Sequence, residues 1–272
     1  MKKSFYSALL FVSLLSFTGY SQQPAAPAQT FQELMDLGVL QSRQGNYPLA
    51  QNYFTQAIQL QPDNAVAYYS RGVTKSNLKD NRGAINDFDK AIELNPRYAD
   101  AYVGRGTSKA RQEDHKGALQ DYNRGIDLNP VDANAYFSRG YSKSKLENYK
   151  GALSDYNKSL DLTPDNALGY AARGAVKQKL EDYKGSLEDF SKAIELSPKR
   201  PSSYSGRAYS KMKMADFKGA ITDYGKALEI SPEDAESLYY RGYCKSQTED
   251  FAGAQIDFDR ALSQDPENAP AY

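Results

Sequence analysis

Seven prolines recur along this chain at one interval, and that interval constrains the fold more than any other feature of the sequence. The spacing is 34 residues without a slip, at Pro62, Pro96, Pro130, Pro164, Pro198, Pro232 and Pro266. A fixed period of this length is typical of a solenoid, in which each repeat buries its apolar face against its neighbours. If each repeat ends two residues after its proline, the chain divides into seven units: 31–64, 65–98, 99–132, 133–166, 167–200, 201–234 and 235–268. Residues 269–272 match the opening of an eighth unit.

Each unit is predicted to form two helices joined by a short turn. The first helix carries a small residue at unit position 8: Gly38, Gly72, Gly106, Gly140, Gly174, Ala208 and Gly242. The second helix carries an aromatic residue at position 24: Phe54, Phe88, Tyr122, Tyr156, Phe190, Tyr224 and Phe258. We expect the small residue to let the two backbones approach, with the aromatic ring filling the space beside it. Asn or Asp at position 16 of every unit is predicted to cap the second helix, and the proline to end it.

These offsets resemble the tetratricopeptide repeat, which has the same 34-residue period. The resemblance covers residues 31–268. It implies an all-α fold, in which antiparallel helix pairs stack into a right-handed solenoid and the first helices line a concave groove. Members of that family mostly use the groove to hold peptides or extended segments of partner proteins.

Three charged positions depart from the family pattern, and they vary together. Position 7 is arginine in units two to seven: Arg71, Arg105, Arg139, Arg173, Arg207 and Arg241. Position 11 is lysine in the same units: Lys75, Lys109, Lys143, Lys177, Lys211 and Lys245. Position 23 is aspartate: Asp87, Asp121, Asp155, Asp189, Asp223 and Asp257. Unit one lacks all three, which favours an ion-pair network within each unit. The alternative is a ladder of cationic sites for an anionic polymer.

The groove is where units differ enough to encode a specific partner. By resemblance, positions 2, 5, 6, 9, 12 and 13 of each unit face it. The candidate binding residues are Tyr69, Arg111, Phe137, Tyr141, Lys145, Lys179, Tyr209, Lys213, Tyr239 and Tyr243. Tyrosine supplies a large amphipathic contact area, and the cations suit acidic side chains. We expect Tyr141 and Tyr209 to stay out of the core between the helices. The alternative is an ordinary solvated face.

Several classes of function have no support in the sequence. Lysine and arginine balance aspartate and glutamate at 34 each, so the basic excess of a nucleic-acid binder is missing. His115 and Cys244 are the only histidine and cysteine, and neither has a partner at catalytic or metal-ligand spacing. Both stand where other units have packing residues. The prediction is a non-enzymatic chain without cofactor or metal.

The amino-terminal segment reads as a targeting signal. Lys2 and Lys3 precede a short apolar run, and Gly19 and Ser21 are small residues before a possible cut at Gln22. We therefore expect a signal peptide at 1–21 and a flexible linker at 22–30. The mature chain would be exported, to the periplasm or beyond, without stable membrane insertion.

Together these features predict a scaffold of the cell envelope that binds a protein or an extended peptide, with acidic partners favoured by the groove cations. The alternative is a targeting or regulatory repeat region of a longer protein whose effector part lies beyond residue 272. The final unit has no polar capping helix in this sequence. We therefore expect its stacking face to be covered by further residues, by a partner or by a second copy of the chain.

Overall fold

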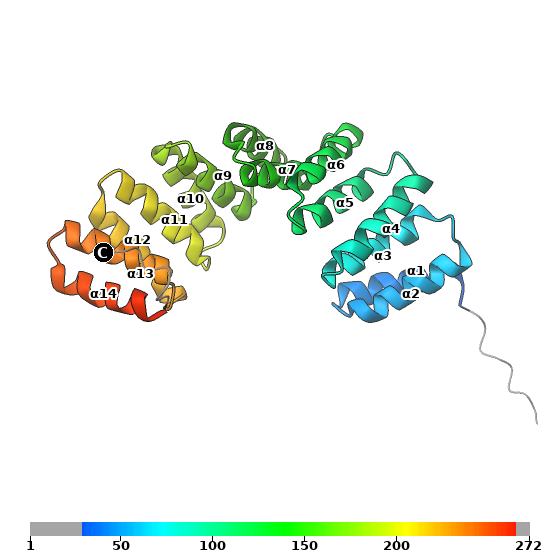
Figure 1. Cartoon of the computed structure of the whole chain (residues 1–272), viewed down its shortest axis with the longest axis horizontal. Coiled ribbons are helices and arrows are strands. Elements are labelled where there is room, and N and C mark those ends of the chain that lie inside the picture. The colour runs from blue at the N-terminus through cyan, green and yellow to red at the C-terminus, as the bar shows by residue number, and fades with distance from the viewer. Residues whose placement is uncertain (1–28, 265–272) are drawn as a thin grey trace, which may run out of the picture.

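The computed structural model describes residues 29–264, and this part of the chain forms fourteen α-helices without a strand (Figure 1). In chain order they are α1 (Phe31–Arg43), α2 (Tyr47–Leu60), α3 (Ala65–Asn77), α4 (Asn81–Leu94), α5 (Ala99–Arg111), α6 (His115–Leu128), α7 (Ala133–Lys145), α8 (Tyr149–Leu162), α9 (Ala167–Lys179), α10 (Tyr183–Leu196), α11 (Pro201–Lys213), α12 (Phe217–Ile230), α13 (Ala235–Gln247) and α14 (Phe251–Gln264). The signal peptide at 1–21, most of the linker and the eighth-repeat start at 269–272 lie outside the described residues.

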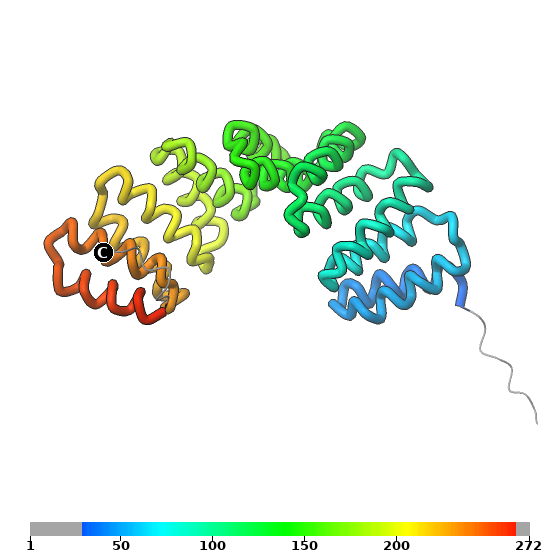
Figure 2. Tube along the Cα trace, viewed as in Figure 1, coloured from blue at the N-terminus to red at the C-terminus, as the bar shows by residue number. Residues whose placement is uncertain are grey.

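The helices pack only against near neighbours, as a solenoid requires. Each helix contacts the next one along the chain, and each odd-numbered helix also contacts the next odd-numbered helix. The seven pairs follow an arc, with α7 and α8 at its crest and α1 and α14 near its two ends (Figure 2). The predicted all-α solenoid of paired helices is therefore confirmed.

Glycine at position 8 sets the distance between the two helices of a unit. A Cβ placed on Gly140 would lie 3.1 Å from the ring of Tyr156, and one on Gly72 would lie 2.9 Å from the ring of Phe88. These aromatic rings are almost fully buried, as are the position-20 alanines of the second helix. The expected close approach of the two backbones is confirmed.

Capping of the second helix follows the prediction in six of the seven units. Asp182, for example, accepts a hydrogen bond from the Gly185 backbone N–H at 2.9 Å. A Cβ on Gly185 would run into the Asp182 carboxylate, so this cap needs the glycine three residues on. Unit one has Leu49 there, and Asn46 makes no side-chain cap bond. The prediction was wrong for Asn46, whose amide instead donates to Gln41.

The residue just before α1 caps that helix. Thr30 caps α1 in a reciprocal arrangement: its hydroxyl accepts from the Glu33 N–H, and the Glu33 carboxylate accepts from the Thr30 N–H at 2.8 Å. Such a capping box stabilises the helix start.

The turn between the two helices of a unit passes through a left-handed residue that the sequence did not reveal. Position 15 has φ between 59° and 65° at Lys79, Glu113, Glu147, Glu181, Ala215 and Glu249, and 77° at Gly45. The following N–H closes the turn: Asn148 donates to the Lys143 carbonyl at 2.9 Å. A non-glycine residue in this region is strained. Glu147, which looks like an ordinary exposed position in the sequence, is therefore unsuitable as a neutral mutational control.

Candidate functional site

The charged positions 7, 11 and 23 meet inside each unit. In the fourth unit, Arg139 donates from Nε and Nη2 to Asp155 at 2.9 and 2.7 Å, and Lys143 Nζ lies 2.8 Å from the same carboxylate. The same geometry recurs in units two to seven. Asp155 is 3% exposed, so its charge is balanced almost entirely by these two cations. The ion-pair interpretation is confirmed.

The arginine of this triad also reaches the preceding unit, which the sequence analysis missed. Arg139 Nη1 donates to Asn123 Oδ1 at 2.8 Å, and Arg105 pairs with Asp89. Arginines of three other units bond to the equivalent position 25, at Thr55, Asn157 and Ser191. The polar residue at position 25 of units one to five was the available signal. The arginines of units two to six therefore tie two units together, whereas Arg241 bonds, among residues 29–264, only within its own unit, because position 25 of unit six is Gly225.

The position-4 tyrosines cover the same arginines. The guanidinium carbon of Arg139 lies 5.4 Å from the ring centroid of Tyr136, and four other units show the same cation–π contact. These cations are thus already engaged in ion pairs with carboxylates and in contacts with tyrosine rings. They belong to the scaffold, so the ladder of cationic sites at positions 7 and 11 is excluded.

The surroundings of the Asp257 carboxyl, in the triad of unit seven, shift its pKa. Burial alone would raise the pKa of Asp257, but hydrogen bonds from Arg241 and Lys245, and their charges, outweigh burial. The net effect lowers the pKa of this carboxyl below its ordinary value. Asp257 therefore stays ionised in the folded protein at neutral pH.

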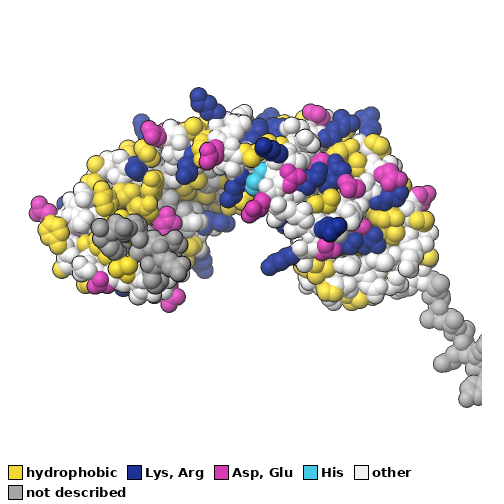
Figure 3. Space-filling view, in the orientation of Figure 1, with side chains coloured by type: hydrophobic (Ala, Val, Ile, Leu, Met, Phe, Trp, Pro, Cys, Tyr) yellow, Lys and Arg dark blue, Asp and Glu magenta, His cyan; other side chains and the backbone are white. Residues whose placement is uncertain are grey.

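The groove positions expected from the family pattern line four cavities on the odd-numbered helices. One cavity of about 520 Å³ spans α9, α11 and α13, and one of about 720 Å³ spans α3, α5 and α7. Smaller cavities of about 280 and 230 Å³ lie between units one and two and between units three and four. The space-filling view shows the hollow beneath the crest of the arc, with lysine and arginine side chains around it (Figure 3).

Two candidate tyrosines are paired with the lysine one turn on. Lys145 Nζ lies 5.6 Å from the ring centroid of Tyr141, and Lys213 Nζ lies 5.4 Å from that of Tyr209. Tyr141 is 45% exposed. Tyr209 is half-buried, and it packs against Tyr240 and the core cluster around Tyr224. The expectation that Tyr209 stays out of the core is wrong, because α13 supplies Tyr240 at position 6 and closes over its ring.

The position-5 aromatics serve the core as well as the groove. Tyr69, Phe137 and Tyr239 lie with ring centroids 5.8, 5.4 and 5.7 Å from the position-24 ring of their own unit. All three are half-buried. Their exposed edges can contact a ligand, but they cannot be removed without loosening the helix pair.

The remaining candidate side chains differ in their exposure and in the contacts they already make. Arg111 reaches back to α3, where its Nη1 donates to the carbonyl and hydroxyl oxygens of Ser76 at 2.9 and 2.6 Å. Lys179 is exposed and lines the 520 Å³ cavity that spans α9, α11 and α13. Tyr243 is partly exposed, and its ring meets the ring of Phe217 edge-on.

His115 and Cys244 lie in packed surroundings. The His115 ring meets Tyr141 edge-on at 6.0 Å, and its Nδ1 lies 3.4 Å from the Ser142 hydroxyl. Cys244 is fully buried, and burial raises the pKa of its thiol to about 11, so the unreactive thiol form prevails. Among residues 29–264, no group of histidine, cysteine and carboxylate side chains is placed to hold a metal ion.

Comparison with known families and structures agrees with this geometry. Family models described as tetratricopeptide repeat match residues 31–64, 77–133, 104–167, 168–200 and 205–269. Among solved structures, YrrB, described as a TPR protein with an unusual peptide-binding site, aligns with a TM-score of 0.59 at 24% identity, over 66% of this chain and 93% of YrrB. Among curated proteins no match was found.

Two further structures share the fold over more of this chain. A tetratricopeptide repeat protein from Parabacteroides merdae aligns with a TM-score of 0.64 at 21% identity, over 88% of this chain and 94% of that protein. Pseudomonas aeruginosa pilF aligns with a TM-score of 0.67 at 19% identity, over 75% of this chain and 93% of that one. At these identities the likeness concerns the fold alone.

Proposed function

The chain belongs to the tetratricopeptide-repeat family, and we propose that it is a non-enzymatic scaffold that holds an extended segment of a partner protein in its concave groove. The fold is one typical of protein–protein interaction. YrrB, whose description names a peptide-binding site, supports the same class of ligand for this chain. Cations are divided between the scaffold and the groove.

Cations at position 13 lie along one edge of the groove. They are Arg43, Arg111, Lys145, Lys179 and Lys213, and none forms an ion pair within residues 29–264. The position-7 and position-11 cations, in contrast, are each ion-paired with a buried aspartate of their own unit. Charges without a counter-ion on a concave surface favour an oppositely charged ligand. The proposed partner segment is therefore acidic.

The proposed setting is the cell envelope, to which the leader-like segment at 1–21 would direct the chain. Within residues 29–264, no helix is both long and apolar enough to cross a membrane. Exported material should begin near Gln22, and intact-mass measurement of the mature pool would check this. Retention of Met1 in that pool would contradict export by cleavage.

Site-specific photo-crosslinking in cells tests the groove directly. A benzoyl-phenylalanine at Tyr141 lies on the groove, and one at Lys158 lies on an exposed position of the even-numbered helix α8. We expect a discrete protein adduct from position 141 and not from position 158. Replacing Lys145 and Lys213 by glutamate should reduce the adduct, whereas the same change at Lys158 and Lys192 should not. Equal adducts from both positions would contradict binding in the groove.

A further inference from the structure

The two larger groove cavities share a feature that the other units lack. Position 6 is glycine only in units three and six, at Gly104 and Gly206. In both places the position-24 phenylalanine of the preceding unit occupies the space a side chain would need: a Cβ on Gly104 would lie 2.7 Å from Phe88 Cζ, and one on Gly206 would overlap Phe190. The phenyl ring therefore lines the groove where a position-6 side chain would otherwise stand.

The cavities beside serine at position 6 are smaller. The one lined by Ser70 has about 280 Å³ and the one lined by Ser138 about 230 Å³, against about 720 Å³ at Gly104 and 520 Å³ at Gly206. At position 9, Thr107 and Ala175 line the larger cavities with small side chains, although Thr107 also lines the 230 Å³ cavity and Tyr209 also lines the one at Gly206. We name the two cavities the Gly104 subsite and the Gly206 subsite.

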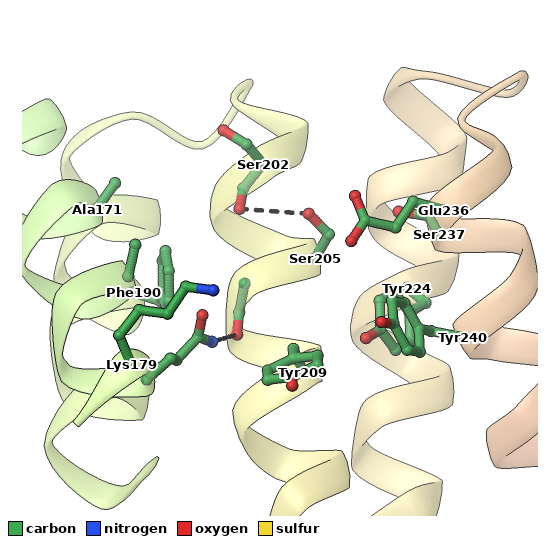
Figure 4. A pocket seen from close by; sticks show the side chains of 13 residues that line it. Ala171, Lys179, Phe190, Ser202, Ser205, Tyr209, Tyr224, Glu236, Ser237 and Tyr240 are labelled. Carbon is green, nitrogen blue, oxygen red and sulfur yellow. Dashed lines mark hydrogen bonds between the residues drawn. The ribbon is translucent and has the colours of Figure 1, made fainter. Parts of the chain in front are cut away.

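The Gly206 subsite combines an apolar wall with buried hydroxyls that lack a partner. The Tyr224 and Tyr240 rings stack at 6.1 Å, with their hydroxyl ends turned toward Tyr209 (Figure 4). Tyr224 and Ser237 are each 1% exposed, both line the cavity, and neither hydroxyl has a hydrogen-bond partner. Buried polar atoms are normally satisfied. A ligand with a polar edge would supply the missing bond.

Charge complementarity indicates what joins the two subsites. Lys145 and Lys179 lie in units four and five, between Gly104 and Gly206, and form no ion pair within residues 29–264. In Figure 4, Lys179 stands on the α9 side of the Gly206 subsite, opposite Glu236 on α13. A ligand that runs along the groove would meet positive charge between the two hollows.

We propose that the Gly104 and Gly206 subsites hold two bulky side chains of one extended protein segment, with acidic residues between them. The inference rests on the proposed groove function and specifies its ligand. The anchor in the Gly206 subsite is an aromatic residue with a hydrogen-bonding edge, tyrosine or tryptophan, because Tyr224 and Ser237 offer hydroxyls there. Three steps between neighbouring helices of roughly 10 Å each give on the order of 30 Å. An extended chain spans that in about nine residues.

Labelled synthetic peptides test this arrangement by fluorescence anisotropy with the full chain. Each probe carries two tryptophans separated by a Glu/Gly/Ser linker of three, eight or fourteen residues, and control probes replace one tryptophan with serine. We expect the eight-residue linker to bind at least about tenfold tighter than either single-tryptophan control, since the second anchor binds intramolecularly. The three-residue linker should show no such gain.

Protein variants with a filled subsite provide the matched test. Thr107→Tyr and Ala175→Tyr introduce at position 9 a residue that this scaffold already carries there in three units. Each should abolish the two-anchor advantage while the single-tryptophan probes still bind through the open subsite. Val39→Tyr makes the same change in unit one, outside both subsites, and should leave the advantage intact. Urea unfolding of all three variants verifies their folding.

The outcomes separate the two proposals. Equal affinity for one- and two-tryptophan probes, or no dependence on the linker, would overturn the two-anchor inference even if Lys145→Glu and Lys213→Glu still weaken binding. Loss of the advantage in Val39→Tyr as well would overturn the assignment of the subsites. If no probe binds and the crosslink at position 141 equals that at position 158, the groove function itself fails.

Discussion

Removing one aspartate from the charge network should cost the solenoid far more stability than removing an exposed one. Asp155→Ala eliminates two bonds from Arg139 and one from Lys143. Each charge-assisted bond contributes about 1.5–3 kcal/mol. Full additivity is not expected, because the side chains of Arg139 and Lys143 keep 17% and 21% of their area exposed and can regain water. We expect a loss of about 2–4 kcal/mol, near the range for breaking a buried ion pair.

Urea unfolding followed by circular dichroism measures this loss, with Asp127→Ala as the control. Asp127 is an exposed aspartate on α6, so its removal should change stability by less than about 0.5 kcal/mol. Repeat arrays can unfold in segments. Hydrogen exchange of α7 and α8 should therefore show whether the loss is local. Equal midpoints and equal exchange for Asp155→Ala and wild type would refute the pairing argument.

Three further predictions concern the stability of the scaffold. Arg139→Leu should cost less than Asp155→Ala, about 1–2 kcal/mol in urea unfolding, because Asp155 keeps Lys143; a larger loss would show that the link to unit three dominates. Folding lowers the pKa of Asp257, so its contribution to the free energy of unfolding should be present at neutral pH and fade as pH falls through its folded pKa. The difference in stability between wild type and Asp257→Ala should therefore narrow from pH 7 to pH 3, and a constant difference would contradict the lowered pKa. Asp182→Ala should cost about 1 kcal/mol through the lost cap of α10, whereas an unchanged unfolding midpoint would mean that the cap bond contributes nothing.

Self-association through the last helices stays a prediction. Phe251 is 68% exposed and Ile256 is 60% exposed on α14, although position 17 in earlier units packs against the next unit, as Phe217 does against Tyr243. A second copy covering this surface should give a concentration-dependent mass in sedimentation, reduced by Phe251→Ser with Ile256→Thr. A monomer at all concentrations would contradict it.

The period and the charge covariation carried most of the fold prediction. Seven repeats of one spacing specify the helix pairs, and loss of arginine, lysine and aspartate together in unit one indicated that they meet. The contacts between units were harder to see, because Asn123 and Asp89 differ in type and only their position recurs. The left-handed turn at position 15 was hidden because glutamate, and not glycine, stands there in four units.

The groove was predictable in its position but not in its depth. Family resemblance places positions 5, 9 and 13 on the concave side, yet it cannot say that Tyr209 is closed over by Tyr240. Nor does it reveal that glycine at position 6 affects the volume of the groove cavity. That effect depends on the position-24 ring of the preceding unit, which occupies the space beside the glycine. That information lies between residues sixteen positions apart, such as Phe88 and Gly104.

The cations at positions 7, 11 and 13 form two sets, one that is ion-paired within the scaffold and one that lies in the groove. Those at positions 7 and 11 pair with an aspartate of their own unit that is almost fully buried, and the arginines of units two to six also bond to the unit before them. Those at position 13 face the groove without an ion-pair partner in residues 29–264. Because the position-7 and position-11 cations are held in ion pairs within the scaffold, the position-13 cations are the ones left to pair with a ligand. Charge reversal at Lys145 and Lys213 should therefore change ligand affinity while leaving the unfolding midpoint close to that of wild type, a separation that reversal at Lys143 cannot give.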